Sequence, residues 1–138
     1  PPDLFKNSAV WLREHAKPET IVFNPYWDRF PHLFFWNQQN YYINGMDPIF
    51  EYAYDPKLYW KTHYYATDIA SEFTCSMIAC TKEEAELTDD VLRDDFHATY
   101  VVLDRNRGHN FYDYLNNNST YNKVFETNDE VVFEIKSK

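Results

Sequence analysis

The stretch T-Y-V-V-L-D, residues 99–104, is the clearest strand in the chain and the best guide to its fold. β-Branched and aromatic residues such as these favour extended backbone. Two shorter runs upstream have the same character, T-I-V-F at 20–23 and Y-Y-I at 41–43. Residues that favour turns follow both runs. The sequence therefore predicts three short strands.

Helical patterns separate these strands. From Phe5 to Ala16, apolar residues recur every three or four positions, which is the spacing of one helix face. Asp3 is placed to cap this helix. Further helices are expected at 28–36, 57–65, 88–96 and 110–115, with Asp55 and Thr88 as the predicted caps of the second and third of these.

Strands that alternate with helices are typical of an α/β fold with a mainly parallel sheet. Right-handed crossovers place helices on both faces of such a sheet. We therefore expect one soluble α/β domain over residues 1–138, a three-layer α/β/α sandwich with a Rossmann-like sheet. Two runs at 121–127 and 130–136 predict a C-terminal antiparallel hairpin about Asn128-Asp129. In the second run, the apolar residues Val131, Phe133 and Ile135 alternate with Val132, Glu134 and Lys136. This hairpin is therefore expected to be covered on one face only.

Residues 66–87 fit two patterns. Apolar residues from Ile69 to Cys80 would share one face of a helix, but a short strand and a loop fit equally well. Cys75 and Cys80 would point away from each other on a continuous helix, with about 140° of rotation between them. In a loop they could form a disulfide. Two small buried thiols are the simpler interpretation.

Composition excludes several classes of chemistry. The chain has 138 residues, a formal net charge of −9 and only two glycines, Gly45 and Gly108. Phosphate-binding loops need two or three glycines at close spacing, so neither a Walker loop nor a dinucleotide fingerprint is present. Two cysteines cannot form a four-thiolate zinc site, and no known catalytic motif occurs. We therefore expect no cofactor and no bound metal.

The acidic balance also limits the possible partners. A negative surface repels phosphate backbones, so nucleic acid is not an expected partner, and anionic lipid head groups are disfavoured in the same way. No run approaches the roughly 18–20 apolar residues of a membrane span. The chain begins with Pro1-Pro2 instead of an initiator methionine, which indicates a part of a longer protein.

Polar residues follow each of the three predicted strands. In open α/β sheets, ligands bind beyond the carboxyl ends of the strands. Carboxylates and amides beside an aromatic ring suit a sugar, because they bond its hydroxyls while the ring covers its C–H groups. Taken singly, the same residues are ordinary helix caps and turn residues. The candidate ligand-binding residues are Asn24, Trp27 and Asp28 after the first strand, Asn44 and Asp47 after the second, and Asp104 and Arg105 after the third.

Aromatic residues are concentrated in one part of the chain. Between Phe23 and Tyr65, 16 of 43 residues are Phe, Trp or Tyr, whereas the other 95 residues hold 11. One interpretation is that these rings form the core and its rim. The other is an amphipathic surface that rests against a membrane-embedded partner or the membrane interface, where Tyr and Trp are favoured.

One block within this aromatic region resembles a known family. W-D-R-F-P-H-L-F-F-W-N at 27–37 and Y-Y-I-N-G-M-D-P-I-F at 41–50 are similar to the C-terminal soluble domain of polytopic membrane glycosyltransferases of the GT-C superfamily. The nearest branch is that of proteins like the dolichyl-phosphate-mannose–protein mannosyltransferases. The segments at 11–23, 96–104 and 124–135 also fit this pattern.

The resemblance implies an extracytoplasmic domain, on the periplasmic or cell-surface side, of an integral membrane enzyme that uses a polyprenyl-phosphate sugar donor. The catalytic carboxylates of that superfamily lie in an early loop outside this chain, so no catalytic residue is expected here. The implied partners are the membrane-embedded part of the same polypeptide and a glycan or lipid-linked sugar. Two alternatives stay open: a free-standing carbohydrate-binding module, and a small glycan-active hydrolase with its acids at the strand ends.

Overall fold

A computed structural model describes residues 3–43, 45, 52–69 and 71–138. Asn44 and Asp47 therefore lie outside the described residues. The predicted strands and helices outside 66–87 are present, with ends that shift by at most three residues. In chain order the elements are α1 (Lys6–His15), β1 (Ile21–Phe23), the 3₁₀ turn η1 (Trp27–Arg29), α2 (Phe30–Trp36), β2 (Tyr41–Ile43), α4 (Pro56–Ala66), β3 (Phe73–Thr74), β4 (Glu86–Leu87), α5 (Thr88–Asp90), the π-helical turn η2 (Val91–Asp95), β5 (Tyr100–Asp104), α6 (His109–Asn116), β6 (Tyr121–Glu126) and β7 (Glu130–Ile135).

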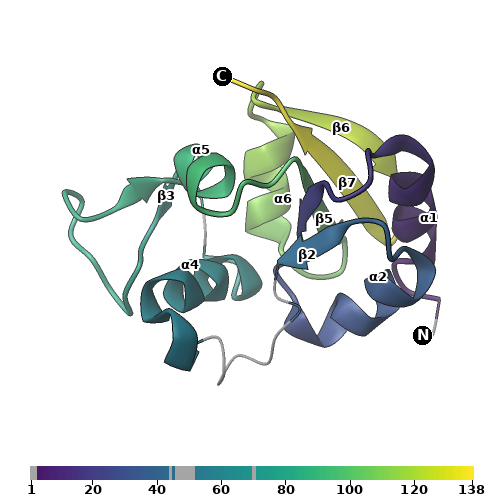
Figure 1. The fold of residues 1–138 in the computed structure, drawn as a ribbon. Helices are drawn as coiled ribbons and strands as arrows, with labels where there is room; N and C mark the ends of the chain where they lie inside the picture. Colours follow the sequence, from purple (N-terminus) through teal and green to yellow (C-terminus); the bar gives the residue numbers. More distant parts are fainter. Residues whose placement is uncertain (1–2, 44, 46–51, 70) are drawn as a thin grey trace.

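The expectation of a mixed α/β fold is confirmed by a five-stranded sheet in the order β2-β1-β5-β7-β6. β1 runs parallel to β2 on one side and to β5 on the other. The C-terminal hairpin joins the sheet through β7, which pairs antiparallel with both β5 and β6. A separate antiparallel pair, β3 and β4, lies away from this sheet (Figure 1). The strand with the clearest sequence signal, β5, is thus the central strand.

Helices pack on both faces of the sheet because its central strands are apolar on both sides (Figure 1). On one face, Phe23 and Val101 pack with apolar residues of α4, η2 and α6. On the other face, Val22 and Val102 pack with α1 and α2. All five residues of β5 are buried, as expected for a strand covered on both sides.

The hairpin differs from the sequence expectation on one point. The alternation predicts Val132 on an open face, but Val132 is fully buried on the α1 side of the sheet. β7 is an interior strand, with Val132 opposite Val102 of β5. The backbone N–H of Ser8 in α1 donates to Oε1 of the buried Glu130 at 2.8 Å and helps to hold the covering helix there. The alternation of residues within β7 cannot reveal that α1, from the other end of the chain, packs on this face.

The stretch 66–87 forms a short strand pair and a loop, so the second of its two sequence patterns is correct. β3 and β4 have two residues each, and the loop between them projects from the body of the molecule (Figure 1). Cys75 and Cys80 form a disulfide within this loop, and both are partly exposed. The interpretation as two buried thiols is therefore wrong. Without a continuous helix, the loop brings their Cα atoms within 5.9 Å.

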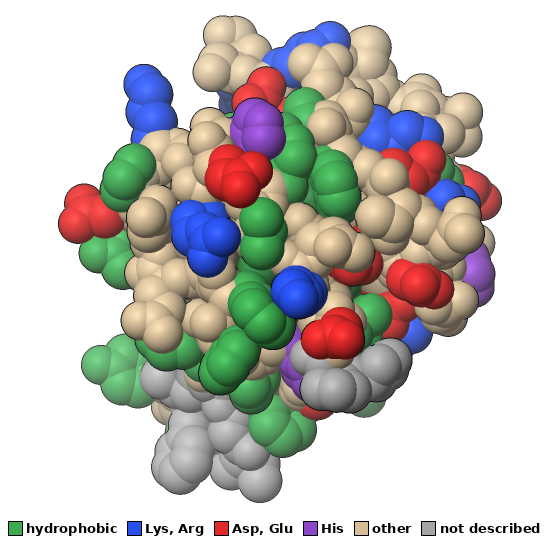
Figure 2. Space-filling model, turned by 90° about the vertical axis from the view of Figure 1, so that its right-hand side faces the viewer, with side chains coloured by type: hydrophobic (Ala, Val, Ile, Leu, Met, Phe, Trp, Pro, Cys, Tyr) green, Lys and Arg blue, Asp and Glu red, His purple; other side chains and the backbone are tan. Residues whose placement is uncertain are grey.

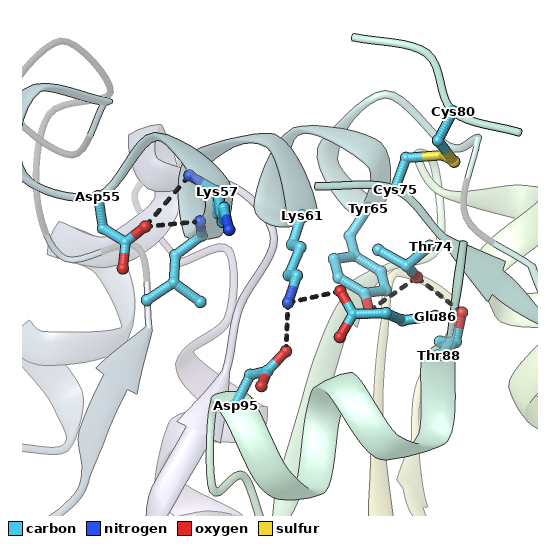
Figure 3. Close-up of polar contacts among 11 residues, drawn as sticks. Asp55, Lys57, Lys61, Tyr65, Thr74, Cys75, Cys80, Glu86, Thr88 and Asp95 are labelled. Carbon is cyan, nitrogen blue, oxygen red and sulfur yellow. Dashed lines mark hydrogen bonds and ion pairs between the residues drawn. A yellow bond between two sulfur atoms is a disulfide. The ribbon is translucent and has the colours of Figure 1, made fainter. Parts of the chain in front are cut away.

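One of the three predicted helix caps is in place. Oδ1 of Asp55 accepts from two backbone N–H groups in the first turn of α4 (Figure 3). Asp3 does not cap α1, because the helix begins only at Lys6 and has no side-chain cap. The hydroxyl of Thr88 also makes no cap. It shares a hydrogen bond of 2.7 Å with Thr74 and ties the start of α5 to β3.

Candidate functional site

The carboxyl ends of β1 and β5 meet at one open cleft with a volume of about 470 Å³. The turn after β1 contributes Tyr26, Trp27 and Asp28, α4 forms another wall, and Arg107 reaches in from the loop after β5. Asp28 and Arg107 are 79 positions apart in the sequence. They converge because parallel strands place their carboxyl ends at the same edge of a sheet. The volume lies in the range of small-ligand sites, roughly 300–1,000 Å³.

Two contacts hold Arg107 at the cleft. Its guanidinium carbon lies 4.1 Å from the ring centroid of Tyr26, in a cation–π contact. Its Nη1 lies 3.4 Å from Oδ1 of Asp28, and the two charged side chains are 39% and 46% exposed. Such an exposed, long ion pair contributes little to stability. The pair is therefore available to exchange water for the hydroxyls of a ligand.

The approach of Arg107 to Tyr26 depends on the glycine that follows it. Gly108 has a φ of 64°, in the left-handed region, and a Cβ at this position would lie 2.7 Å from Oη of Tyr26. Glycine adopts this conformation without steric cost, so the loop after β5 can lie close to the tyrosine ring. Burial raises the pKa of the Tyr26 phenol above its ordinary value, so the ring beneath Arg107 stays neutral.

Aromatic rings supply the apolar surface of the cleft. Trp27, the first residue of η1, is 48% exposed. On α4, the rings of Tyr59 and His63 are stacked with their centroids 6.0 Å apart. Their four-residue spacing places both on one face of the helix. An exposed indole beside a carboxylate and a guanidinium suits both the apolar face and the hydroxyl edge of a sugar ring.

Two of the candidate residues from the sequence, Trp27 and Asp28, line this cleft. Asn24 is buried and shapes the turn that carries them. Its side-chain amide donates to the backbone oxygen of Tyr26 at 2.8 Å, and its Oδ1 accepts from the N–H of the same residue at 3.2 Å. Asn44 and Asp47, the candidates after β2, lie outside the described residues.

Asp104 and Arg105 are not part of the cleft. Asp104 is buried and lines a neighbouring hollow of about 480 Å³, together with Glu130. The guanidinium of Arg105 lies 4.6 Å from the ring centroid of Tyr112 and 3.0 Å from Oε2 of Glu126. The structure therefore does not bring Asp104 and Arg105 into the cleft with Trp27 and Asp28, because successive side chains along this segment diverge.

Acidic side chains dominate the neighbouring hollow, but backbone groups already engage the two buried ones. Oδ1 of Asp104 accepts from the N–H of Asn106 at 2.9 Å, and Oε1 of Glu130 accepts from Ser8. Within the described ranges, no group of three or more His, Cys, Asp or Glu side chains is arranged to bind a metal ion. We therefore assign this hollow a structural role, in which its acids fix a loop and α1 against the sheet.

Sequence reasoning missed Arg107 and the α4 wall. The pattern after β5 draws attention to Arg105, the cation nearest the strand. The dipeptide Arg107-Gly108 is the signal that identifies the right cation, since a glycine allows its neighbour a close approach. The spacing of Tyr59 and His63 marks them as one helix face. Only the fold shows that this face borders the cleft.

No family model, curated protein or solved structure matches the chain significantly. None of the helices in the described part of the chain combines the length and the hydropathy that a membrane crossing requires.

Proposed function

We propose that the chain is an accessory extracytoplasmic domain of an integral membrane glycosyltransferase that uses a polyprenyl-phosphate sugar donor, and that its cleft binds the carbohydrate acceptor. On its own the domain transfers no sugar. One observation carries the proposal: the exposed ring of Trp27 stands beside the Asp28–Arg107 pair at the carboxyl ends of two parallel strands.

Each group in the cleft has a counterpart on a pyranose ring. The indole of Trp27 offers a flat apolar surface to C–H groups. The carboxylate of Asp28 accepts hydrogen bonds and the guanidinium of Arg107 donates them, so the pair can bond two neighbouring hydroxyls at once. The charges of Asp28 and Arg107 cancel, so this pair by itself does not favour an anionic ligand.

The Cys75–Cys80 disulfide supports the extracytoplasmic side. Disulfides form and persist in oxidising compartments and are rare in the cytosol. The sequence block at 27–50 resembles the soluble domain of the GT-C enzymes. This resemblance supports the proposal that the partner of the domain is the membrane-embedded part of the same polypeptide. The two arguments are independent, since the disulfide lies outside that block.

We also propose that the sheet and its helices form a Rossmann-like α/β/α sandwich. The parallel order β2-β1-β5 supports this, as do the helices that pack on both faces. The antiparallel hairpin β6–β7 extends the sheet beyond the parallel strands. In this arrangement the cleft occupies the edge at which open α/β sheets bind their ligands.

The coding sequence upstream of Pro1 tests the membrane assignment directly. We expect several apolar segments of about 20 residues each, the length that crosses a bilayer. A signal peptide immediately upstream, with no such segments, would instead assign the chain to a secreted protein. That outcome removes the glycosyltransferase proposal and leaves the carbohydrate site to be tested by itself.

Calorimetric titration of the chain with neutral oligosaccharides tests the cleft. We expect Trp27→Ala to weaken binding about tenfold or more, because truncation of a central aromatic contact commonly has this effect. Arg107→Ala is expected to weaken it in the same direction. Phe73→Ala is the matched control, since Phe73 is a 41% exposed aromatic residue on β3 and does not line the cleft. Glycan binding by both cleft variants at the wild-type level would show that the cleft is not the site.

A free-standing carbohydrate-binding module is the second candidate. It is favoured by the fact that this one chain supplies Trp27, Asp28 and Arg107 without a partner. Tight glycan binding by the chain alone, together with an upstream signal peptide, would select this alternative. The hydrolase alternative gains no support from Asp104 and Glu130, because backbone N–H groups engage both carboxylates.

A further inference from the structure

The short helix α2 presents aromatic side chains to solvent, although one of them, Trp36, is half-buried and also packs against the core cluster that contains Leu33. Leu33 is the residue of this helix that is fully buried, whereas Phe34 and Phe35 are 44% and 71% exposed. A shallow hollow of about 290 Å³ lies beside Phe35 and is lined by Pro31, His32, Phe35 and Trp36. We use the name α2 surface for five residues of this helix: Pro31, His32, Phe34, Phe35 and Trp36. Contiguous exposed apolar groups of this kind mark interaction sites.

Cations border the α2 surface. Nζ of Lys6 lies 4.5 Å from the ring centroid of Trp36, and Nη1 of Arg13 donates to the backbone oxygen of Trp36 at 3.2 Å. Residues 29–46 contain no Asp or Glu, although the chain has 22 of these acids. Figure 2 shows the side of the molecule that carries α1 and α2, where hydrophobic side chains gather and both Lys or Arg and Asp or Glu side chains lie among them.

Along the whole chain too, the acidic residues are unevenly distributed, with most of them outside the part that contains α2. Residues 1–43 carry four Lys or Arg and four Asp or Glu, whereas residues 44–138 carry nine and eighteen. The net charge of −9 therefore belongs to the second part of the chain, whereas the charges of residues 1–43 balance. The expectation that anionic lipid head groups are disfavoured follows from the total charge and does not apply to this first part. An anionic surface repels that part but attracts the cations beside α2, so the charges favour one orientation, with α2 towards the anionic surface.

We propose that the α2 surface docks the chain on the head-group layer of a bilayer that contains anionic lipids. Phe34 and Phe35, the exposed rings of α2, enter the interfacial layer, where aromatic side chains are favoured. Lys6 and Arg13 pair with lipid phosphates, as basic residues near a membrane surface do. The proposal does not depend on the ligand of the cleft, because the cleft is built from η1, α4 and the loop after β5.

Flotation of the chain with lipid vesicles tests this proposal. We expect binding to phosphatidylcholine vesicles that contain phosphatidylglycerol, and weaker binding to phosphatidylcholine alone. Phe35→Ala is expected to weaken binding to the mixed vesicles about tenfold, because the variant lacks the aromatic ring whose transfer from water into the interfacial layer favours binding. The double variant Lys6→Gln, Arg13→Gln is expected to lose the preference for anionic vesicles and the dependence of binding on salt.

Ile78→Ala is the matched control. The side chain of Ile78 is 78% exposed, a fraction similar to the 71% of Phe35. It lies in the disulfide loop and not on α2. We expect this variant to bind vesicles as the wild type does, and circular dichroism to show that all variants fold. Three results overturn the proposal: wild-type chain that binds no vesicles, equal losses for Ile78→Ala and Phe35→Ala, or a dimer that Phe35→Ala dissociates. Phe35→Ala should still bind glycans normally, so failure here is separate from failure of the cleft.

Discussion

Asp68 holds the start of α6 from outside the helix. Its Oδ2 accepts from the N–H of Asn110 at 3.0 Å, and its Oδ1 accepts from the N–H of Phe111 at 2.9 Å. The first N–H groups of a helix have no partner within it, and Gly108, which precedes α6, has no side chain to bond them. Asp68 thus acts as an N-cap from 42 positions away. Its φ of 62° lies in the left-handed region, which Asp adopts more readily than most other non-glycine residues.

Replacing Asp68 with Ala removes both of these hydrogen bonds. We expect the free energy of unfolding to fall by about 1–2 kcal/mol, the usual cost of losing an N-cap. Urea denaturation followed by circular dichroism measures this change. Asp55→Ala is the comparison, because Asp55 caps α4 from its own N-terminus. A much smaller loss for Asp68→Ala than for Asp55→Ala would argue against the long-range cap.

At the scale of elements, polar contacts attach the β3–β4 pair to the rest of the molecule. Thr74 shares hydrogen bonds with Tyr65 at 3.1 Å and with Thr88 at 2.7 Å (Figure 3). The facing residues Phe73 and Leu87 are both exposed, so the pair gains little from apolar packing. The disulfide closes the adjoining loop and compensates for this small core contact.

A buried lysine makes a second polar attachment. Nζ of Lys61 in α4 lies 2.8 Å from Glu86 in β4 and 2.5 Å from Asp95 in η2 (Figure 3). Burial by itself would lower the pKa of Lys61, but hydrogen bonds to the two carboxylates and their charges outweigh it and raise the pKa. The ammonium group therefore stays charged and links three elements that the sheet does not join.

Loss of the disulfide should loosen this element more than the sheet. We expect the double variant Cys75→Ser, Cys80→Ser to lose about 2 kcal/mol of unfolding free energy, the entropy that a short closed loop removes from the unfolded chain. Hydrogen exchange should show faster opening in residues 73–88 and little change in β5. Equal loss of protection in β5 would show that the loop and the sheet unfold as one unit.

At the scale of the molecule, buried tyrosines set the response to alkaline pH. Burial is the largest cause of their raised pKa values, and the carboxylate of Asp89, which accepts from Tyr114 and Tyr121, adds to it. A raised pKa in the folded state means that the unfolded chain releases these protons first. The stabilisation is therefore complete below pH 10 and is lost as the pH rises above it. The tyrosines concerned are Tyr26, Tyr42, Tyr65, Tyr114 and Tyr121.

We therefore expect the urea midpoint to be nearly constant around neutral pH and to fall steeply above about pH 10, the ordinary pKa of tyrosine. Lys61 acts in the same direction, because its raised pKa also favours the folded state below its titration. Ultraviolet absorbance of tyrosinate, recorded with circular dichroism, measures both events. Ionisation of all tyrosines near pH 10 without unfolding would contradict the burial of their hydroxyls.

Much of the fold could be predicted from the sequence because the signals are local. The apolar run of β5, the hairpin β6–β7 and the cap of α4 by Asp55 depend on residue type and spacing over a few positions. Predictions from local sequence patterns were wrong where the outcome depends on a distant segment or where one pattern fits two structures. The burial of Val132 depends on α1, and the state of the two cysteines depends on a loop whose sequence also fits a helix.

The candidate site follows the same division. The sequence by itself determined which residues are available beyond each strand, and so it identified Trp27 and Asp28. Only the tertiary structure decided that Arg107 joins them and that Arg105 turns away. The physical reason is the distance along the chain. A contact across 79 positions depends on the packing of the whole sheet and its helices, whereas propensity and periodicity act only between near neighbours.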